Sequence, residues 1–168
     1  MLVRRDALER AGGIAVIRGD IIDDCALAAV MKRRGPIWLG LTERATSLRP
    51  YGGLSDIGRM ISRSAYAQLR YSPWRLTGIL LGLGVVYLAA PLLAVFDHGV
   101  AQALGALAWL AMAAAFQPML RFYGRSPLWG LALPLIAALY AAFTFWSAIQ
   151  VWRGAGGVWK GRAQAITP

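Results

Sequence analysis

The sequence lacks most of the side chains that catalytic and metal-binding proteins commonly use. It contains one cysteine, Cys25, and one histidine, His98, in 168 residues. A single cysteine excludes an internal disulfide and a multi-cysteine metal site. Because no histidine lies near Cys25 in the sequence to activate its thiol, we interpret Cys25 as a packed small side chain and not as a nucleophile. His98 stands between two apolar stretches, and we interpret it as a polar turn residue.

Charge is also scarce, and it is unevenly distributed. Only 15% of the residues are charged and 58% are hydrophobic, a composition that indicates a membrane protein. The first 75 residues contain 13 Lys and Arg against 7 Asp and Glu. A basic soluble part next to a membrane indicates an anionic leaflet or a phosphate-bearing ligand. No nucleic-acid recognition motif or aromatic interleaving is present, so we expect no nucleic-acid partner.

Three stretches of the second half contain no charged residue: 76–96, 99–120 and 126–152. Each is at least as long as the roughly 20 residues that a membrane-spanning helix needs. The sequence therefore predicts three transmembrane helices within residues 74–152. Kinks are expected at the proline in each helix: Pro91, Pro118 and Pro134.

The orientation of these helices leaves two alternatives open. Basic residues before position 76, together with Arg121 and Arg125, place the soluble part in the cytoplasm by the positive-inside rule. We therefore expect a multi-pass protein of the bacterial inner membrane. Three full crossings would put the tail, residues 153–168, outside, although it carries Arg153, Lys160 and Arg162. Either one stretch is re-entrant or the tail lies outside against its charge, and the sequence slightly favours three full crossings.

Residues 55–73 predict an amphipathic helix that lies in the membrane interface. Placed on a helix, five apolar residues share one side: Ile57, Met60, Ile61, Ala65 and Leu69. The opposite side carries Arg59, Arg63, Tyr66 and Arg70, and Ser55 is expected to cap the first turn. These arginines could contact lipid phosphates or a phosphorylated substrate. Alternatively, they are only the positive flank of the first span.

Asp23 and Asp24 form the only concentrated pair of acids in the chain. They precede a helical pattern, where free backbone N–H groups and the helix dipole favour ionised carboxylates. One aspartate is enough to cap a helix. The second is then available to accept a proton from a substrate hydroxyl or to hold a divalent cation. The alternative is that both are caps.

The rest of residues 1–54 predicts a mixture of helix and strand. A short helix over residues 5–11 is expected to stop at Gly12 and Gly13, and a second helix to run from the acid pair to Gly35. The apolar run 37–41 predicts a buried strand. We therefore expect an α/β arrangement for this part.

Several of these features, in this order, resemble the second half of the catalytic domain of family 2 processive-type glycosyltransferases. The similar residues are Arg4-Arg5, the paired glycines, Asp23-Asp24 with Leu27 three residues on, and the segment around Arg63 that falls at the Gln-x-x-Arg-Trp motif. Met60 and Ser64 stand where that motif has glutamine and tryptophan. Over nearly its whole length the chain is most similar to the hopanoid-biosynthesis-associated glycosyltransferases.

The resemblance implies a fold and a domain organisation. Residues 1–54 would be the C-terminal part of an α/β catalytic domain of the GT-A type. An interfacial helix over 55–73, three transmembrane helices over 74–152 and a basic tail would follow. The nucleotide-binding half, with its Asp-x-Asp metal motif, is not among these residues, so we expect the sequence to be a fragment or to begin at a misplaced start codon.

The resemblance also implies roles for four residues. Asp24 takes the place of the general base and Asp23 that of the adjacent acid. Arg63 takes the place of the arginine that faces the nucleotide diphosphate, and Arg59 on the same helix is a second candidate for substrate binding. Mg²⁺ or Mn²⁺ is implied for the whole enzyme, held mainly by the absent half, and we assign no metal ligand in this chain.

The expected function is therefore a part of an inverting membrane glycosyltransferase. Its partners would be a nucleotide-sugar donor and a lipid acceptor, for which a hopanoid is one candidate. The chain alone is expected to be inactive, because it lacks the nucleotide-binding half. The alternative is a non-catalytic three-span membrane protein whose basic helix binds anionic lipid or docks a partner.

Overall fold

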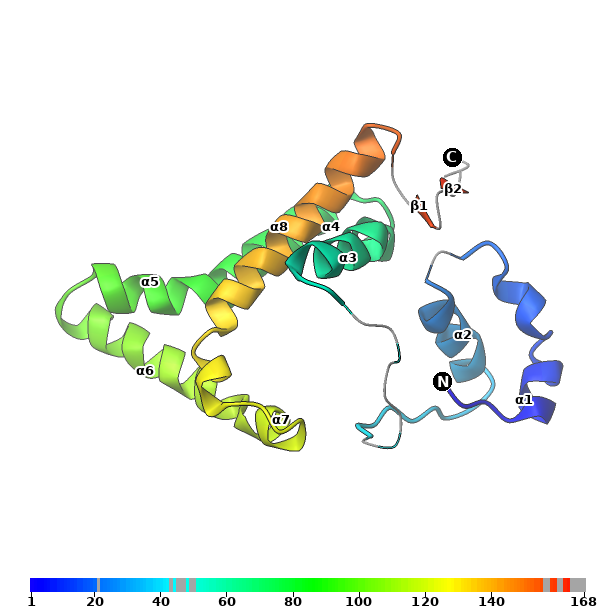
Figure 1. Cartoon of the computed structure of the whole chain (residues 1–168), viewed down its shortest axis with the longest axis horizontal. Coiled ribbons are helices and arrows are strands. Elements are labelled where there is room, and N and C mark those ends of the chain that lie inside the picture. Colours follow the sequence, from blue (N-terminus) through cyan, green and yellow to red (C-terminus); the bar gives the residue numbers. More distant parts are fainter. Residues whose placement is uncertain are drawn as a thin grey trace.

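The computed structural model of the chain describes residues 1–20, 22–42, 44, 48 and 51–155, and the backbone of 158–159 and 162–163. Nearly all of its regular structure is helical (Figure 1). The amino-terminal elements are α1 (Arg5–Arg10), the 3-10 helix η1 (Ile14–Ile17) and α2 (Asp23–Lys32). The remaining helices are α3 (Leu54–Gln68), α4 (Pro73–Leu83), η2 (Gly84–Leu88), α5 (Ala89–Phe96), α6 (Gly99–Ala115), α7 (Gln117–Phe122), η3 (Pro127–Gly130) and α8 (Leu133–Trp152).

The expectation that residues 1–54 are the C-terminal part of an α/β domain of the GT-A type is wrong. The described residues of this part form helices only, and the predicted strand at 37–41 is absent. A strand must pair its backbone N–H and C=O groups with a neighbouring strand, and the described residues nearby supply none. Trp38 and Leu39 are 88% and 98% exposed. The described strands are β1 (Val158–Trp159) and β2 (Arg162–Ala163). Each has two residues, and they pair with each other antiparallel near the end of the chain.

Helix α1 stops where the paired glycines predict. Gly12 and Gly13 have φ values of +96° and +72°, a region in which a side chain would be strained. The N–H of Gly13 donates to the carbonyl of Leu8 at 2.9 Å, which closes the helix end. Helix α2 then packs on η1. Of the described residues up to position 42, Ala11 and Ile17 alone are buried, so this segment has almost no core.

The prediction of a membrane protein is confirmed at the level of helix length and composition. Three helices are long and apolar enough to cross a membrane: Pro73–Phe96, Gly99–Phe122 and Leu133–Trp152. The third begins at Leu133 and not at residue 126, because Pro127–Gly130 forms the separate short helix η3. Pro134 lies in the first turn of α8, where proline is tolerated, so it causes no kink.

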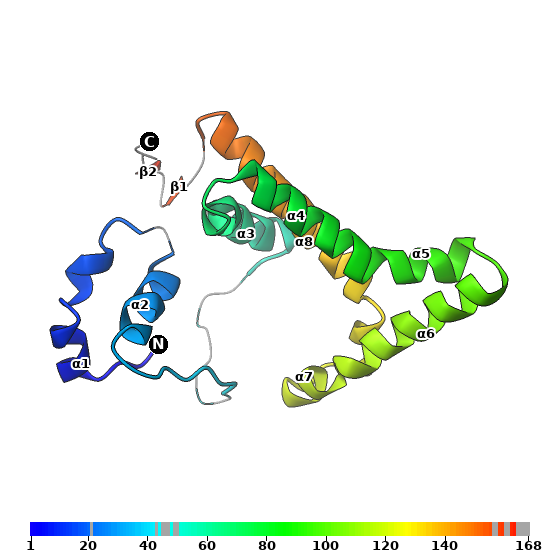
Figure 2. The same ribbon diagram turned by 180° about the vertical axis from the view of Figure 1, so that it is seen from behind.

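The first long helix changes direction at η2, a π-helical turn. Pro91 follows this turn, and its missing N–H leaves an upstream carbonyl without its usual partner, which explains a disturbance at this point. Beyond η2, α5 and α6 form an antiparallel hairpin that diverges from α4 and α8 (Figure 2). The second long helix is interrupted at Phe116, just ahead of Pro118.

Close packing within this hairpin depends on Gly105. A Cβ atom at this position would lie 2.7 Å from the backbone nitrogen of Ala94 and 2.8 Å from the carbonyl oxygen of Ala90. Such distances are too short for a carbon atom, so α5 and α6 could not approach as they do with a side chain there. A Cβ at Gly82 or Gly84 of the first long helix would instead meet open space, so these glycines allow no such close approach.

Helix α3 lies against α8, and both lie beside α4 (Figure 1). Their shared core consists of Tyr66, Leu76 and Ala148, with four partly buried residues packed around it: Leu69, Tyr71, Leu80 and Val151. The core therefore joins the end of α3, the start of α4 and the end of α8.

Candidate functional site

The acid pair lies at the start of α2, as the sequence predicts. Asp23 and Asp24 are both exposed in the first turn, and the residue before them, Ile22, has no side chain that can cap. The Oδ1 atom of Asp23 accepts from the N–H of Asp24 at 3.0 Å, and that of Asp24 accepts from the N–H of Cys25 at 2.8 Å. Each carboxylate thus satisfies one N–H of the first turn while remaining accessible from solvent.

Cys25 stands directly after this pair and is exposed. Partial desolvation and then the neighbouring Asp24 carboxylate raise the pKa of the Cys25 thiol above its ordinary value. A raised pKa keeps the thiol protonated near neutral pH, which disfavours nucleophilic chemistry. The interpretation of Cys25 as a packed side chain is wrong, because the residue is exposed. That it is not a nucleophile remains a prediction, and the raised pKa of its thiol favours it.

The apolar stripe predicted for α3 is only partly its packed face: Ala65 is buried and Leu69 packs against the core, but other members of the stripe are exposed. Its buried residues are Gly58, Ser62, Ala65 and Tyr66. Tyr66, which we placed on the arginine side, is 1% exposed. Ile57 and Met60 of the predicted stripe stay 37% and 43% exposed. Small residues face α8 because they allow close approach of the two helices. Ile57 and Met60 remain outside this contact, whereas Leu69 packs against the core around Tyr66.

Polar and aromatic contacts fix α3 to α8. The Ser62 hydroxyl donates to the carbonyl of Phe143 at 3.1 Å, and the Ser147 hydroxyl accepts from the N–H of Tyr66 at 3.1 Å. The Tyr66 hydroxyl donates to the Tyr71 carbonyl at 2.8 Å, and its ring lies 5.8 Å, edge to face, from that of Trp152. A Cβ at Gly58 would lie 2.7 Å from the Phe143 ring.

These α8 contacts were not found by sequence reasoning. Thr144 and Ser147 are both 2% exposed, although they belong to an otherwise apolar stretch. The Thr144 hydroxyl donates to the carbonyl of Tyr140 within the helix, at 2.8 Å. Two hydroxyl residues three positions apart on an apolar helix are a signal of a helix–helix contact, and this signal could have located the α3 site on α8.

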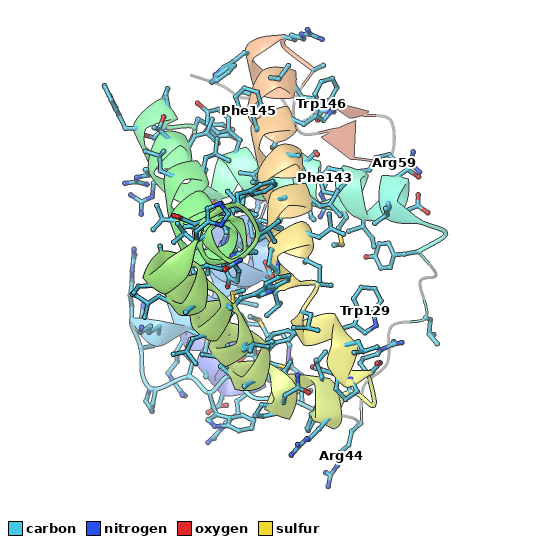
Figure 3. The ribbon with its side chains drawn as sticks, turned by 90° about the vertical axis from the view of Figure 1, so that its left-hand side faces the viewer. Arg44, Arg59, Trp129, Phe143, Phe145 and Trp146 are labelled. Carbon is cyan, nitrogen blue, oxygen red and sulfur yellow. The ribbon has the colours of Figure 1, made fainter. Side chains whose placement is uncertain are left out.

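The two candidate arginines differ in their surroundings. Arg59 is exposed and forms a salt bridge with Asp56, and its side chain points away from α8 (Figure 3). The Asp56 carboxylate also accepts from the N–H of Gly52 at 2.8 Å, so Asp56 and not Ser55 holds the start of α3. Arg63 is half-buried, and its Nε atom has no solvent exposure. Arg59 is thus accessible, whereas Arg63 is held closer to the packed helices.

The structure does not bring the acid pair and the arginines into one site. Asp24 belongs to α2, and Figures 1 and 2 both show α1 and α2 apart from α3 and α8. Within the part of the chain that the structure describes, no group of three or more His, Cys, Asp or Glu residues could hold a metal ion. The described residues therefore contain separate candidate groups, not an assembled catalytic centre.

No family model, no curated protein and no solved structure matches this chain. Three apolar helices indicate a membrane protein. Its activity has to be inferred from the residues described above.

Proposed function

We propose that this chain is the membrane-embedded, acceptor-side part of an inverting glycosyltransferase. The enzyme transfers a sugar from a nucleotide-sugar donor to a lipid acceptor, with a hopanoid as one candidate. The observation that carries the proposal is the exposed pair Asp23 and Asp24, presented by a segment that is directly connected to helices able to cross a membrane. The proposal requires that this segment bring the accessible carboxylate to the surface of the lipid phase.

The segment that bears the acid pair also exposes much apolar surface. Leu2, Trp38 and Leu39 are 103%, 88% and 98% exposed. In the proposal these side chains pack against another folded body. A nucleotide-binding body seated on this segment would cover them and would bring the donor sugar towards the acid pair.

The proposed reaction needs one base and one source of positive charge. The Asp24 carboxylate takes the proton of the acceptor hydroxyl while that oxygen forms a bond to the anomeric carbon of the sugar. The bond from this carbon to the nucleotide diphosphate breaks, and the leaving group departs with its negative charge. Guanidinium groups stabilise phosphate by paired hydrogen bonds, and this is the role proposed for Arg63, with Arg59 as an outer contact.

A divalent cation, Mg²⁺ or Mn²⁺, would add Lewis-acid stabilisation of the leaving diphosphate. The described residues contain no cluster of ligands that fits such an ion. The proposed ion would therefore be held by the nucleotide-binding body, and Asp24 would act as a base.

The test is replacement of Asp24 by asparagine in the membrane-bound enzyme together with its nucleotide-binding part. Loss of a positioned general base should lower sugar transfer by about 100-fold or more. Asp20→Asn is the matched control, because Asp20 is also exposed and lies just before α2, and its activity should be unchanged. Transfer is measured as labelled sugar in the lipid extract of membranes, with protein abundance measured by blotting.

A non-catalytic membrane protein that binds anionic lipid through α3 is the second candidate. The firm attachment of α3 to α8 favours it, because that contact holds the basic helix at the membrane without any need for a substrate. In this case Asp24→Asn would remove only a first-turn contact, worth roughly 1 kcal/mol. Full sugar transfer by Asp24→Asn membranes would exclude the proposed catalytic role.

A further inference from the structure

The end of α8 and the start of α4 lie at the same end of the helical region. Leu76, in the first turns of α4, and Ala148, near the end of α8, share one core with Tyr66. The Tyr66 ring also contacts the ring of Trp152, the last residue of α8. Both views show α4 and α8 running side by side in opposite directions (Figures 1 and 2).

This arrangement constrains the path of the chain through the membrane. If a membrane surrounds such an antiparallel pair, the chain leaves α8 on the side from which it enters α4. The α5–α6 hairpin connects the far ends of the pair and returns to the side from which it starts. Of the two alternatives that the sequence left open, the one with a re-entrant segment agrees with this packing.

Three arginines from separate parts of the chain flank this shared end. Arg70 follows α3, Arg75 lies in the first turn of α4, and Arg153 follows α8. All three are exposed, and each is within two residues of a side chain that belongs to the core or packs against it. The core therefore places these three positions at one end of the α3–α4–α8 assembly.

The neighbouring residues indicate what this surface contacts. Trp74 and Trp152 are 86% and 56% exposed at the same end, and exposed tryptophan beside apolar helices is typical of the headgroup layer. The acids in residues 51–155 are Asp56 and Asp97. Asp56 pairs with Arg59 in the first turns of α3, and Asp97 lies at the α5–α6 turn. Neither acid therefore lies at the end where the three arginines are, and an anionic partner from outside these helices would be complementary to them.

We propose that Arg70, Arg75 and Arg153 form one cationic surface that binds the phosphate groups of anionic lipids in a single leaflet. The proposal requires that the tail after α8 emerges on the same side of the membrane as the amino-terminal segment. It does not depend on the proposed glycosyltransferase activity.

The side of the tail is tested by labelling with a membrane-impermeant maleimide at pH 8. Native Cys25 reports the side of the amino-terminal segment, and Ala155→Cys in a Cys25→Ser background reports the tail. Both are exposed. In sealed vesicles of known orientation the two positions should react from the same side. Reaction of Ala155→Cys from the opposite side, or only after detergent is added, would overturn the proposal.

The lipid contact is tested by native mass spectrometry of the protein released from bilayers with equal phosphatidylglycerol and phosphatidylcholine. The wild-type protein should retain several-fold more phosphatidylglycerol, since each surface arginine favours anionic lipid by up to about fivefold. The triple variant should retain the two lipids in a ratio of phosphatidylglycerol to phosphatidylcholine close to one. It combines Arg70→Gln, Arg75→Gln and Arg153→Gln. The matched control is Arg10→Gln, which should leave the lipid ratio unchanged, because Arg10 pairs with Asp6 in α1 and α1 lies apart from α3, α4 and α8 (Figures 1 and 2). Equal retention of both lipids by the wild-type protein would contradict the proposal.

Discussion

Residues 1–42 and residues 51–155 are both rich in helix, yet they differ in what holds their helices in place. In the first region Ala11 and Ile17 are the buried residues among those described. In the second region α3, α4 and α8 share a core around Tyr66, which is 1% exposed. The comparison shows that local sequence is enough to form a helix, whereas a packed partner is needed to place it.

The range of the contacts explains the difference. The ion pairs of the amino-terminal region join residues at most four positions apart, such as Arg5 with Glu9 and Arg10 with Asp6. Exposed pairs of this kind contribute little, roughly 0.3–0.5 kcal/mol each. The contacts of α3 instead reach α8, 81 residues further along the chain. The first of these hydrogen bonds is partly buried and the second is buried, and together they tie α3 to a helix that is long and apolar enough to cross a membrane.

The largest expected effect is that of Tyr66→Ala. This change removes a buried ring, two edge-to-face ring contacts and a hydrogen bond to the Tyr71 carbonyl. Truncation of a buried aromatic residue costs about 3–5 kcal/mol. Thermal unfolding of the purified protein in lipid discs should show a large drop in Tm. Tyr123→Ala is the control, because Tyr123 is 52% exposed, and an equal drop in both variants would contradict the assigned core.

A smaller effect is expected for Ser147→Ala. Its hydroxyl accepts from the N–H of Tyr66 in the buried contact between α3 and α8. Hydrogen bonds between helices in membranes contribute about 0.6 kcal/mol on average and up to about 1.7 kcal/mol. The same unfolding assay should therefore show a modest loss of stability for Ser147→Ala and none for Ser64→Ala on the partly exposed side of α3. No difference between the two variants would mean that this hydrogen bond does not hold α3.

Features set by neighbouring residues could be predicted from the sequence. Paired glycines predicted the end of α1, the acid pair marked the start of α2, and long uncharged stretches predicted three apolar helices. Each depends on the conformational freedom, charge or hydropathy of a few adjacent residues. The predicted strand at 37–41 was wrong, because a strand also depends on a neighbour elsewhere in the chain.

Features set by distant residues could not be predicted. The apolar stripe of α3 suggested that Tyr66 faces outward, but α8 selects the side with Gly58 and Ser62. Similarly, the sequence suggested Ser55 as the cap of α3. In the structure the Asp56 carboxylate, not Ser55, holds the start of this helix by accepting a hydrogen bond from the N–H of Gly52. The roles assigned to Asp24 and Arg63 remain predictions, because they require an arrangement that the described part of the chain does not itself assemble.

The most direct test of the difference between the two regions is amide hydrogen exchange of the 168-residue chain in lipid discs. In a helix held by a packed core, the backbone hydrogen bonds rarely break to expose their amides to solvent, whereas in a helix without such a core they break easily. We expect amides of α3 near Tyr66 and of α8 near Ala148 to exchange at least about 100-fold more slowly than those in the middle of α2. Equal protection of α2 and α3 would show that the amino-terminal segment has a stable core of its own, and would contradict the claim that only the second region is held by packing.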